Sequence, residues 1–239
     1  MIKMVITGRR RPGMTLAQLH RYMLEVHGPM VVGHIQRDAG AVPQRYVQNH
    51  AFDSFYIAQA NPTPLSLNRD FVTQVWFDDM PQAMAALQQP FYLTQLQPDE
   101  DNFVDQSSVV KLPVLEKLVS GPSECSANFK AFLMIKRPAT STLEQFHKEW
   151  GTLSNHLSQS LTQSASGLVK HVQCTVLHRP TEEACIDGIN ECWFSSKEQA
   201  VLGLEHMRQT LSQQTPAGID CTMIGNMIGI AAEEHALYV

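Results

Sequence analysis

Hydrophobic and polar residues along this 239-residue chain follow two alternating patterns. Short apolar runs of strand length occupy residues 2–7 and 129–136. After each run, apolar residues recur every three or four positions, as on one face of a helix. These residues are Leu16, Leu19, Met23, Val26 and Met30 in the first half, and Leu143, Phe146, Trp150, Leu153 and Leu157 in the second. The pattern predicts a strand followed by a helix, twice.

Both of these helices are expected to begin in the same way. Thr15 and Thr142 each stand three residues before a glutamine, which is the spacing of a capping box. Further strands are predicted at residues 45–49, 71–77 and 108–115, and again at 168–177, 188–194 and 222–230. A second helix in each half is signalled by the capping residues of DMPQ (79–82) and SKEQ (196–199). The order is therefore βαββαβ, repeated.

The two halves also resemble each other in amino-acid sequence. IKMVITGRRRPGMTLAQLHRYM (2–23) aligns with FKAFLMIKRPATSTLEQFHKEW (129–150) if Arg11-Pro12 is set over Arg137-Pro138 and one residue is inserted after it. Further on, RYVQ aligns with KHVQ, and QVWF aligns with ECWF. The preserved order of these matches indicates an internal duplication.

The repeated order predicts an α+β fold made of two ferredoxin-like units. The second half begins with a strand that is apolar on both faces, so both faces of its sheet are expected to be buried. We expect one sheet to cover the other and to form an internal, pseudo-dimeric α+β barrel. The expected domains are residues 1–117 and 129–239, joined by a linker at 118–128 that is rich in Gly, Pro and Ser.

The motifs RRPGMT, RYMLEVHGPMV, RYVQN and VWFDD, in this order, resemble the EthD family of the dimeric α+β barrel superfamily. The resemblance covers residues 1–117 and is weaker in KRPATSTLEQFHKEW, KHVQ and ECWFSS of the second half. It implies the barrel fold, but the activities it implies are diverse. Members accompany oxidising enzymes in ether degradation, or decarboxylate or dehydrate aromatic polyketides. Relatives in the superfamily are cofactor-free monooxygenases, cyclases, isomerases and haem binders, so the fold does not choose among them.

His27 is the leading candidate for chemistry, because it directly precedes Gly28-Pro29. A residue before proline is disfavoured in the α region, so the helix is expected to stop or kink at His27. Unpartnered carbonyls at such an end would favour a protonated imidazole, which suits general acid–base catalysis. The resemblance also implies a recurrent histidine at this place. The alternative is a histidine that only caps the helix.

Four further residues are candidates for binding a ligand. His20 lies one heptad before His27 on the same stripe, but about 10 Å away along the axis, too far to share a metal. His34 would join them only if the helix continued past Pro29, which is not expected. Tyr46 and Gln48 share one strand face and either orient a ligand or pack the barrel. Met23 offers an adaptable apolar contact.

The second half lacks the candidate histidine. At a constant offset of 127 residues, Ser154 takes the place of His27, and Asn155-His156 take the place of Gly28-Pro29. The expected arrangement is one working half and one degenerate half.

Composition excludes several classes of protein. Apolar residues make up 44% and charged residues 17%, as in a globular chain. The net charge is −5, and basic residues are scattered apart from Arg9, Arg10 and Arg11, which argues against nucleic acid as a partner. No apolar run is long enough to span a membrane, and the start does not resemble a signal peptide. Five cysteines without CxxC spacing indicate reduced thiols in a cytoplasmic protein, with no metal site.

We expect a cofactor-independent enzyme that acts on a small apolar or aromatic oxygenated compound by His-assisted proton transfer, or by oxygenation. The proton-transfer reactions would be decarboxylation, dehydration or isomerisation, which are those of a lyase or isomerase. The alternative is a non-catalytic binding or accessory protein of an oxidative degradation pathway. Haem also stays open, because a single axial histidine leaves no sequence motif. A homodimer of the whole chain could form as well.

Overall fold

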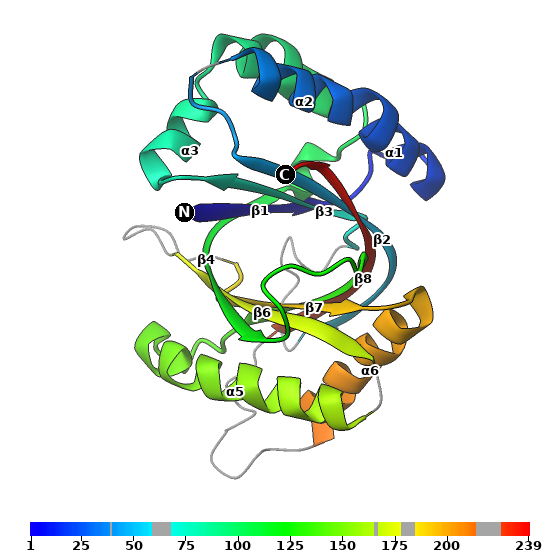
Figure 1. The fold of residues 1–239 in the computed structure, drawn as a ribbon, viewed down its shortest axis with the longest axis vertical. Helices are drawn as coiled ribbons and strands as arrows, with labels where there is room; N and C mark the ends of the chain where they lie inside the picture. Colours follow the sequence, from blue (N-terminus) through cyan, green and yellow to red (C-terminus); the bar gives the residue numbers. More distant parts are fainter. Residues whose placement is uncertain (39, 59–67, 165–166, 178–184, 214–225) are drawn as a thin grey trace. The chain divides into compact units, whose positions relative to one another are not determined.

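The computed structural model describes residues 1–38, 40–58, 68–164, 167–177, 185–213 and 226–239. It has an α+β fold whose strands, in the hydrogen-bonded order β1-β3-β2-β8-β5-β7-β6-β4, form a closed eight-stranded barrel (Figure 1). The predicted α+β barrel is thereby confirmed. The chain divides into two compact units, which are described separately. Unit 1 comprises Met1–His50, Leu67–Val114 and Glu234–Val239, and unit 2 comprises Ala51–Ser66 and Leu115–Glu233. The domain boundaries expected from the sequence stay a prediction.

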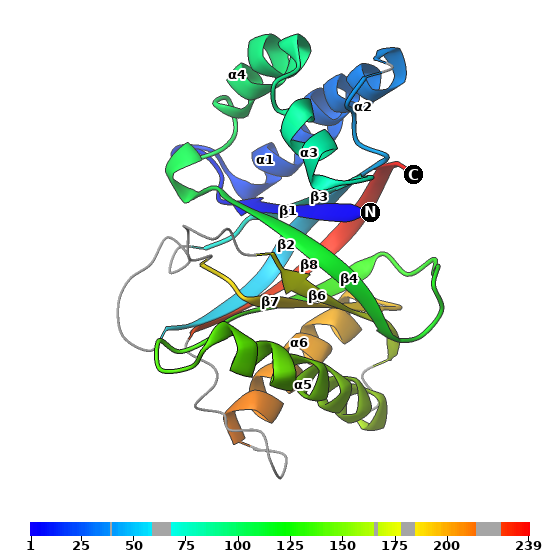
Figure 2. The ribbon, with the colours of Figure 1, turned by 90° about the vertical axis from the view of Figure 1, so that its left-hand side faces the viewer.

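In unit 1, β1 (Ile2–Gly8) pairs with β3 (Phe71–Phe77) and with the start of β4 (Val110–Ser120). β3 also pairs with the first residues of β2 (Arg45–Ala58), and all these pairings are antiparallel. The helices α1 (Leu16–Tyr22), α2 (Gly28–Arg37), α3 (Met80–Ala86) and α4 (Gln97–Glu100) cover one face of this sheet (Figure 2). The cavity described below lies under these helices.

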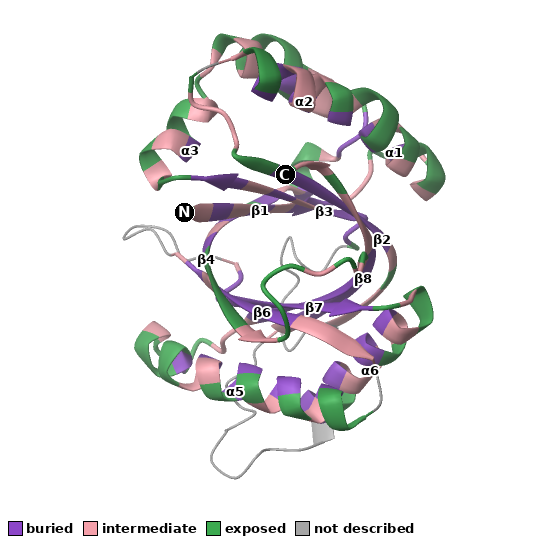
Figure 3. Cartoon of the chain, viewed as in Figure 1, coloured by how far each residue is buried: buried purple, intermediate pink, exposed green. Residues whose placement is uncertain are grey.

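In unit 2, β5 (Phe129–Lys136) lies between β7 (Gly188–Phe194) and β8 (Asn226–Tyr238), and β6 (Leu168–Val176) pairs with β7. The helices α5 (Leu143–Gln163) and α6 (Lys197–Gln213) cover one face of these strands. Figure 3 shows the buried residues of α5 on the side that faces the strands. The core between them includes Phe146, Trp150 and Leu157, three of the residues predicted from the helical period.

Most predicted elements have the expected position. The strands at 71–77, 129–136 and 188–194 are confirmed with the same bounds. β2 and β8 extend beyond the runs predicted at 45–49 and 222–230, and the first four residues of the latter run lie outside the described residues. Both capping boxes are present, with Gln18 N–H donating to Thr15 Oγ1 and Gln145 N–H to Thr142 Oγ1, each over 3.2 Å.

Two tryptophans have matching surroundings in the two units. Both are buried, and each lies opposite one basic residue on either neighbouring strand. Lys3 and Arg45 lie over the ring of Trp76, at 5.4 and 4.7 Å from its centroid. Lys130 and Lys170 lie over Trp193, at 4.3 and 4.8 Å. These are cation–π distances, so each indole both fills space and stabilises two positive charges, one of which is buried (Lys3 in unit 1, Lys130 in unit 2).

Two of the arginines after the first strand form ion pairs. Arg9 pairs with Asp105 at 2.7 Å and Arg10 with Asp70 at 2.9 Å. Arg10 N–H also donates to the Asp70 carboxylate over 2.8 Å, and Arg137 N–H donates in the same way to Asp187. Arg10, and not Arg11, is therefore the counterpart of Arg137, at the same offset of 127 that relates the two capping boxes. The inserted residue assumed in the sequence alignment is not needed.

The helix does not end at His27, so the stop expected there was wrong, although the regular α-helical pattern is interrupted at this place. α1 passes into a π-helical turn, η1 (Met23–His27), and the chain continues as α2 with Gly28 at φ −55° and ψ −53°. Gly28 N–H donates to Met23 O, five residues earlier. Pro29 has no N–H and would clash with a carbonyl four residues earlier in a regular α-helix, and the wider turn relieves this conflict. The carbonyls near His27 are thus not those of a helix end.

A second π-helical turn, η3 (Tyr92–Leu96), was not predicted. It precedes Gln97-Pro98 as η1 precedes Gly28-Pro29, and Gln97 N–H donates to Tyr92 O, again five residues earlier. Both turns contribute residues to the same cavity, and π turns are frequent at functional sites.

Gly28→Ala should destabilise the protein by about 1–3 kcal/mol, because an added Cβ would lie 2.9 Å from Met23 O and 2.8 Å from Leu237 Cδ1. Gly33→Ala, in the same helix, would meet only the far end of the Arg37 side chain and should stabilise by about 0.5–1 kcal/mol. Urea unfolding of both variants measures the difference. Equal effects would show that the π turn does not require glycine at position 28.

Candidate functional site

A mainly apolar cavity lies in unit 1 between the helices and the sheet. Its volume is about 130 Å³, and its apolar lining includes Ile6, Val31, Val75, Phe77, Leu96 and Phe103. An engineered cavity of about 150 Å³ with comparable walls binds benzene. The cavity therefore has the size of one six-membered ring with small substituents.

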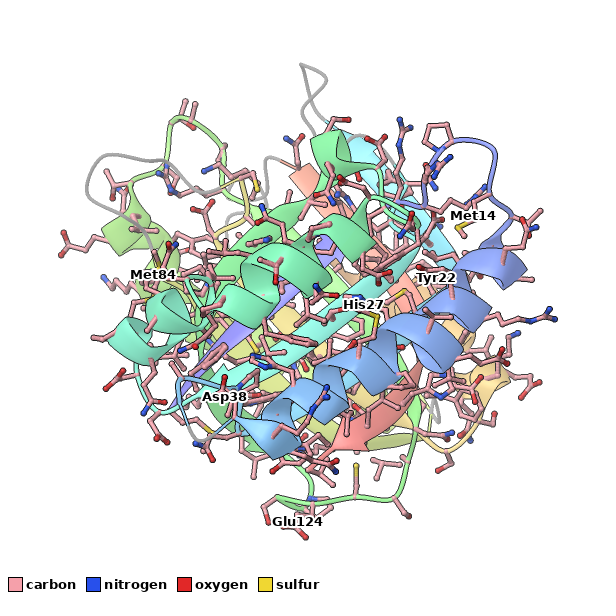
Figure 4. All side chains as sticks on the ribbon, turned by 90° about the horizontal axis from the view of Figure 1, so that it is seen from above. Met14, Tyr22, His27, Asp38, Met84 and Glu124 are labelled. Atoms are coloured by element: carbon pink, nitrogen blue, oxygen red, sulfur yellow. The ribbon has the colours of Figure 1, made fainter. Side chains whose placement is uncertain are left out.

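His27 lies at this cavity and is held by Asp99. Its Nδ1 is 2.9 Å from Asp99 Oδ2, and the two side chains are only 11% and 10% exposed. A carboxylate only accepts hydrogen bonds, so Nδ1 must carry the hydrogen and Nε2 of the neutral ring is left with its lone pair. Figure 4 shows His27 between the helix formed by α1, η1 and α2 and the segment that carries η3 and α4. The arrangement prepares Nε2 to accept a proton.

Asp99 is anchored by more than one donor. Tyr22 OH donates to Asp99 Oδ1 over 2.6 Å, and Asn102 Nδ2 donates over 3.3 Å. The hydrogen bond from His27, followed by those from Tyr22 and Asn102, lowers the pKa of Asp99 below its usual value, although burial opposes this shift. Asp99 is therefore a carboxylate near neutral pH and would stabilise a protonated His27.

Tyr46 and Gln48 share a face of β2, as predicted, and are joined to the π turn. Tyr46 lines the cavity and is 2% exposed, and Gln48 lies behind it, fully buried. Gln48 Nε2 donates both to Tyr46 OH over 2.6 Å and to Met23 O over 2.8 Å. Met23, also predicted for the site, lines the cavity. Gln48 thus contacts Tyr46 directly, while it is absent from the cavity lining.

A second group of polar side chains, Tyr92, Glu100 and Lys111, lines the same cavity. Lys111 Nζ donates to Tyr92 OH over 3.3 Å. Burial raises the pKa of Glu100, although the positive charges of Lys111 and His27 oppose this shift. Burial, with a smaller contribution from the Glu100 charge, also raises the pKa of Tyr92. A carboxyl group that is costly to ionise thus lies in the same cavity as the His27 ring.

His34 and His20 differ from expectation. Because the helix continues, His34 is buried at the cavity, with its ring stacked 4.8 Å from Phe91. His20 is not part of the lining; its ring stacks 4.5 Å from His50, and its Nε2 lies 3.3 Å from Asp70 O. Burial lowers the pKa of His50 to about 3, so this ring stays neutral. The predicted binding role of His20 stays a prediction.

In unit 2 the corresponding place is filled. Ser154, the counterpart of His27, is buried and donates to Trp150 O over 2.9 Å. Trp150 is the counterpart of Met23, is 1% exposed, and packs against Gly188 so closely that a Cβ there would lie 2.5 Å from the indole. α5 is one uninterrupted helix of 21 residues. A bulky ring thus occupies the space that Met23 leaves open in unit 1.

Sequence reasoning missed Tyr92, Asp99, Glu100 and Lys111. The first three belong to a helical segment between α3 and β4 that the βαββαβ pattern does not contain. Pro98 with Asp99 and Glu100 has the composition of a helical first turn, and this was the available signal.

The structure gives little support to a metal or haem at this site. Among the described residues, the only three His, Cys, Asp or Glu side chains close enough to share a metal ion are Glu116, Cys174 and Glu191 of unit 2. Haem does not fit the cavity at His27, because a porphyrin has four pyrrole rings and about 130 Å³ accommodates one.

Residues 11–107 match the family model described as EthD domain. This part of the chain is similar to the EthD domain. The resemblance seen in the sequence is confirmed there. A comparison with curated proteins gives no match.

Solved structures share the fold over nearly the whole chain. An anthrone oxidase-like protein is 8% identical, with 99% of this chain and 92% of that chain covered and a TM-score of 0.54. A mutant chlorite dismutase from Candidatus Nitrospira defluvii is 11% identical, with coverage of 99% and 92% and a TM-score of 0.51. A heme-binding protein from Thermus thermophilus is 9% identical, with coverage of 98% and 90% and a TM-score of 0.50. At these identities the likeness concerns the fold alone.

None of the helices in the described part of the chain is both long and apolar enough to cross a membrane.

His27→Phe should raise the pKa of Asp99 more than Tyr22→Phe does, because the His27 hydrogen bond is the largest cause of its depression. Both changes keep an aromatic ring and remove one donor. Carboxylate ¹³C NMR titration measures the pKa. A larger rise in Tyr22→Phe would show that His27 is not the main partner of Asp99.

Proposed function

We propose that this protein is a cofactor-independent enzyme that transfers a proton on a small apolar or aromatic oxygenated compound. The observation that carries the proposal is the His27–Asp99 pair, with an Nδ1–Oδ2 distance of 2.9 Å at the wall of an apolar cavity. His27 is the general acid–base. Asp99 fixes the orientation of the His27 ring and stabilises its positive charge, and Tyr46 and Met23 bind the ligand.

The surroundings of His27 suit proton transfer. In an apolar cavity few water molecules compete for the ring, and the charge that His27 gains is balanced by Asp99. A positioned acid–base group of this kind contributes about 10²–10⁴-fold to a rate. Decarboxylation, dehydration and isomerisation all need such a group.

Oxygenation is the second candidate reaction. A base that ionises an electron-rich aromatic compound prepares it to react with dioxygen, without a cofactor. The description of one structural neighbour as anthrone oxidase-like agrees with chemistry of this kind. The cavity volume favours a compound of one ring over the three fused rings of anthrone.

We also propose that the barrel arose by tandem duplication of a ferredoxin-like βαββαβ unit, with a working N-terminal copy and a degenerate C-terminal one. Three matched features support this origin: the capping boxes, the tryptophans between two cations, and the arginine amides bound to Asp70 and Asp187. A cytoplasmic location, the lack of a nucleic-acid partner and a homodimer stay predictions.

The proposal is tested with a panel of phenols, benzoic acids and aryl ketones of one ring. The protein is incubated with each compound in D₂O, and ¹H NMR follows exchange, loss of CO₂ or loss of water, while an oxygen electrode follows oxygenation. We expect turnover of at least one compound, with a pH dependence that disappears in His27→Gln together with about 10²–10⁴-fold of the rate.

Ser154→Ala is the matched control, because it changes the counterpart of His27 in unit 2 and should leave the rate within about twofold. Asp99→Asn should lower the rate, because its amide no longer fixes the imidazole tautomer. Turnover that survives His27→Gln would refute the assignment. Binding without turnover of any compound would favour the non-catalytic binding protein.

A further inference from the structure

The orientation of the Gln48 amide is fixed by its neighbours. Met23 O can only accept a hydrogen bond, so the group 2.8 Å from it must be the amide nitrogen, Nε2. The amide oxygen, Oε1, then faces Nε2 of His50 at 3.0 Å and accepts its hydrogen. This agrees with a neutral His50, whose burial lowers its pKa to about 3.

This orientation determines the role of the Tyr46 hydroxyl. The second hydrogen of Gln48 Nε2 is donated to Tyr46 OH over 2.6 Å, so the phenol oxygen is an acceptor in that bond. Its own hydrogen must point elsewhere, and no acceptor for it is found among the described residues. A buried donor without a partner is unfavourable, and Tyr46 is 2% exposed and lines the cavity. A ligand oxygen in the cavity would satisfy it.

Burial keeps Tyr46 protonated, because it raises the pKa of its hydroxyl well above the usual value. The hydroxyl is therefore a donor at any pH at which the protein functions. It cannot act as a base. Its hydrogen also cannot point at the Gln48 amide nitrogen, because the Nε2 hydrogens occupy that side of the phenol oxygen.

We propose that Tyr46 donates a hydrogen bond to the carbonyl oxygen of the ligand, so that the natural ligand is a neutral carbonyl compound of about one ring. A carbonyl oxygen only accepts, as this donor requires, and the cavity admits one ring. Gln48 is a positioning residue, which acts through Tyr46 and does not touch the ligand. This inference deepens the proposed function and rests on it.

The carbonyl would also allow His27 to act on carbon. His27 Nε2 takes a proton from the carbon next to the carbonyl, the C–H electron pair forms a C=C bond, and the carbonyl π electrons move to the oxygen. Tyr46 stabilises the resulting enolate oxygen, and His27 returns the proton to the same or another carbon. The step needs no oxidant, and loss of one oxyanion donor typically costs about 10²–10³-fold.

The test uses acetophenone with a ¹³C-labelled carbonyl and, as the isostere without an acceptor, α-methylstyrene. Infrared difference spectra of the bound ketone should show a lower C=O stretching frequency in the wild type than in Tyr46→Phe. Calorimetry should show about tenfold weaker binding of acetophenone to Tyr46→Phe, and no weakening for α-methylstyrene.

Gln48→Glu and Tyr92→Phe separate Tyr46 from its neighbours. A carboxylate at position 48 would accept the Tyr46 hydrogen, so Gln48→Glu should raise the C=O frequency although Tyr46 is intact. Tyr92→Phe removes another hydroxyl from the cavity lining and should leave the frequency unchanged. Tyr46→Phe keeps the ring. If Gln48→Glu does not fold, Tyr46→Phe by itself still tests the hydrogen bond from Tyr46 to the ligand carbonyl.

A C=O frequency that is equal in wild type and Tyr46→Phe would overturn the inference, and so would a lack of acetophenone binding. The proposed function is read separately, from deuterium exchange of the ketone methyl group in D₂O. A lowered frequency without exchange would support the Tyr46 contact and contradict His27 as the base. Exchange that depends on His27 but not on Tyr46 would support His27 as the base and contradict the Tyr46 contact.

Discussion

A proline nitrogen cannot donate a hydrogen bond, and the site of this protein depends on how the chain accommodates that fact. At Pro29 the helix is not broken but widened, so that Gly28 N–H bonds Met23 O five residues earlier. The widened turn carries both Met23 and His27, and Gln48 anchors the same Met23 carbonyl to β2. Pro98 has the same consequence in the segment that carries Tyr92 and Asp99. Two prolines thus help to position the polar groups of one cavity.

Each reactive side chain at the cavity has a partner behind it that fixes its hydrogen. Asp99 holds the Nδ1–H of His27, and Gln48 occupies the lone pair of Tyr46. In a mainly apolar enclosure such partners matter more than at a surface, because unpaired polar groups cost more and charges interact more strongly there. The result is a base, His27, and a hydrogen-bond donor, Tyr46, each with a defined orientation. In unit 2, Trp150 fills the corresponding place, and Ser154 bonds to the main chain.

Much of the fold was predictable because it depends on local signals. The threonine–glutamine spacing defines both helix starts, and apolar runs locate the strands, so the repeated pattern predicts the α+β barrel. His27 was a candidate because it precedes a Gly-Pro pair, and Met23 and Tyr46 were candidates from the helical stripe and the strand alternation. All three line the cavity, while their roles stay predictions. The course of the helix at Pro29 was not predictable, because proline permits either an end or a wider turn. The sequence also does not show that Gln48 and Leu237 approach position 28 too closely for a Cβ. Asp99 was not predicted, because its partner His27 is 72 residues away in sequence.

The central claim is that His27 faces the cavity as the tautomer protonated at Nδ1, with Nε2 open to a ligand. Long-range ¹H–¹⁵N NMR of the His27 ring, recorded on the alkaline side of its titration, reports which nitrogen carries the hydrogen. The account predicts a protonated Nδ1 and an Nε2 resonance that shifts when benzaldehyde is added. A ring protonated at Nε2, or one that does not respond to the added compound, would contradict it.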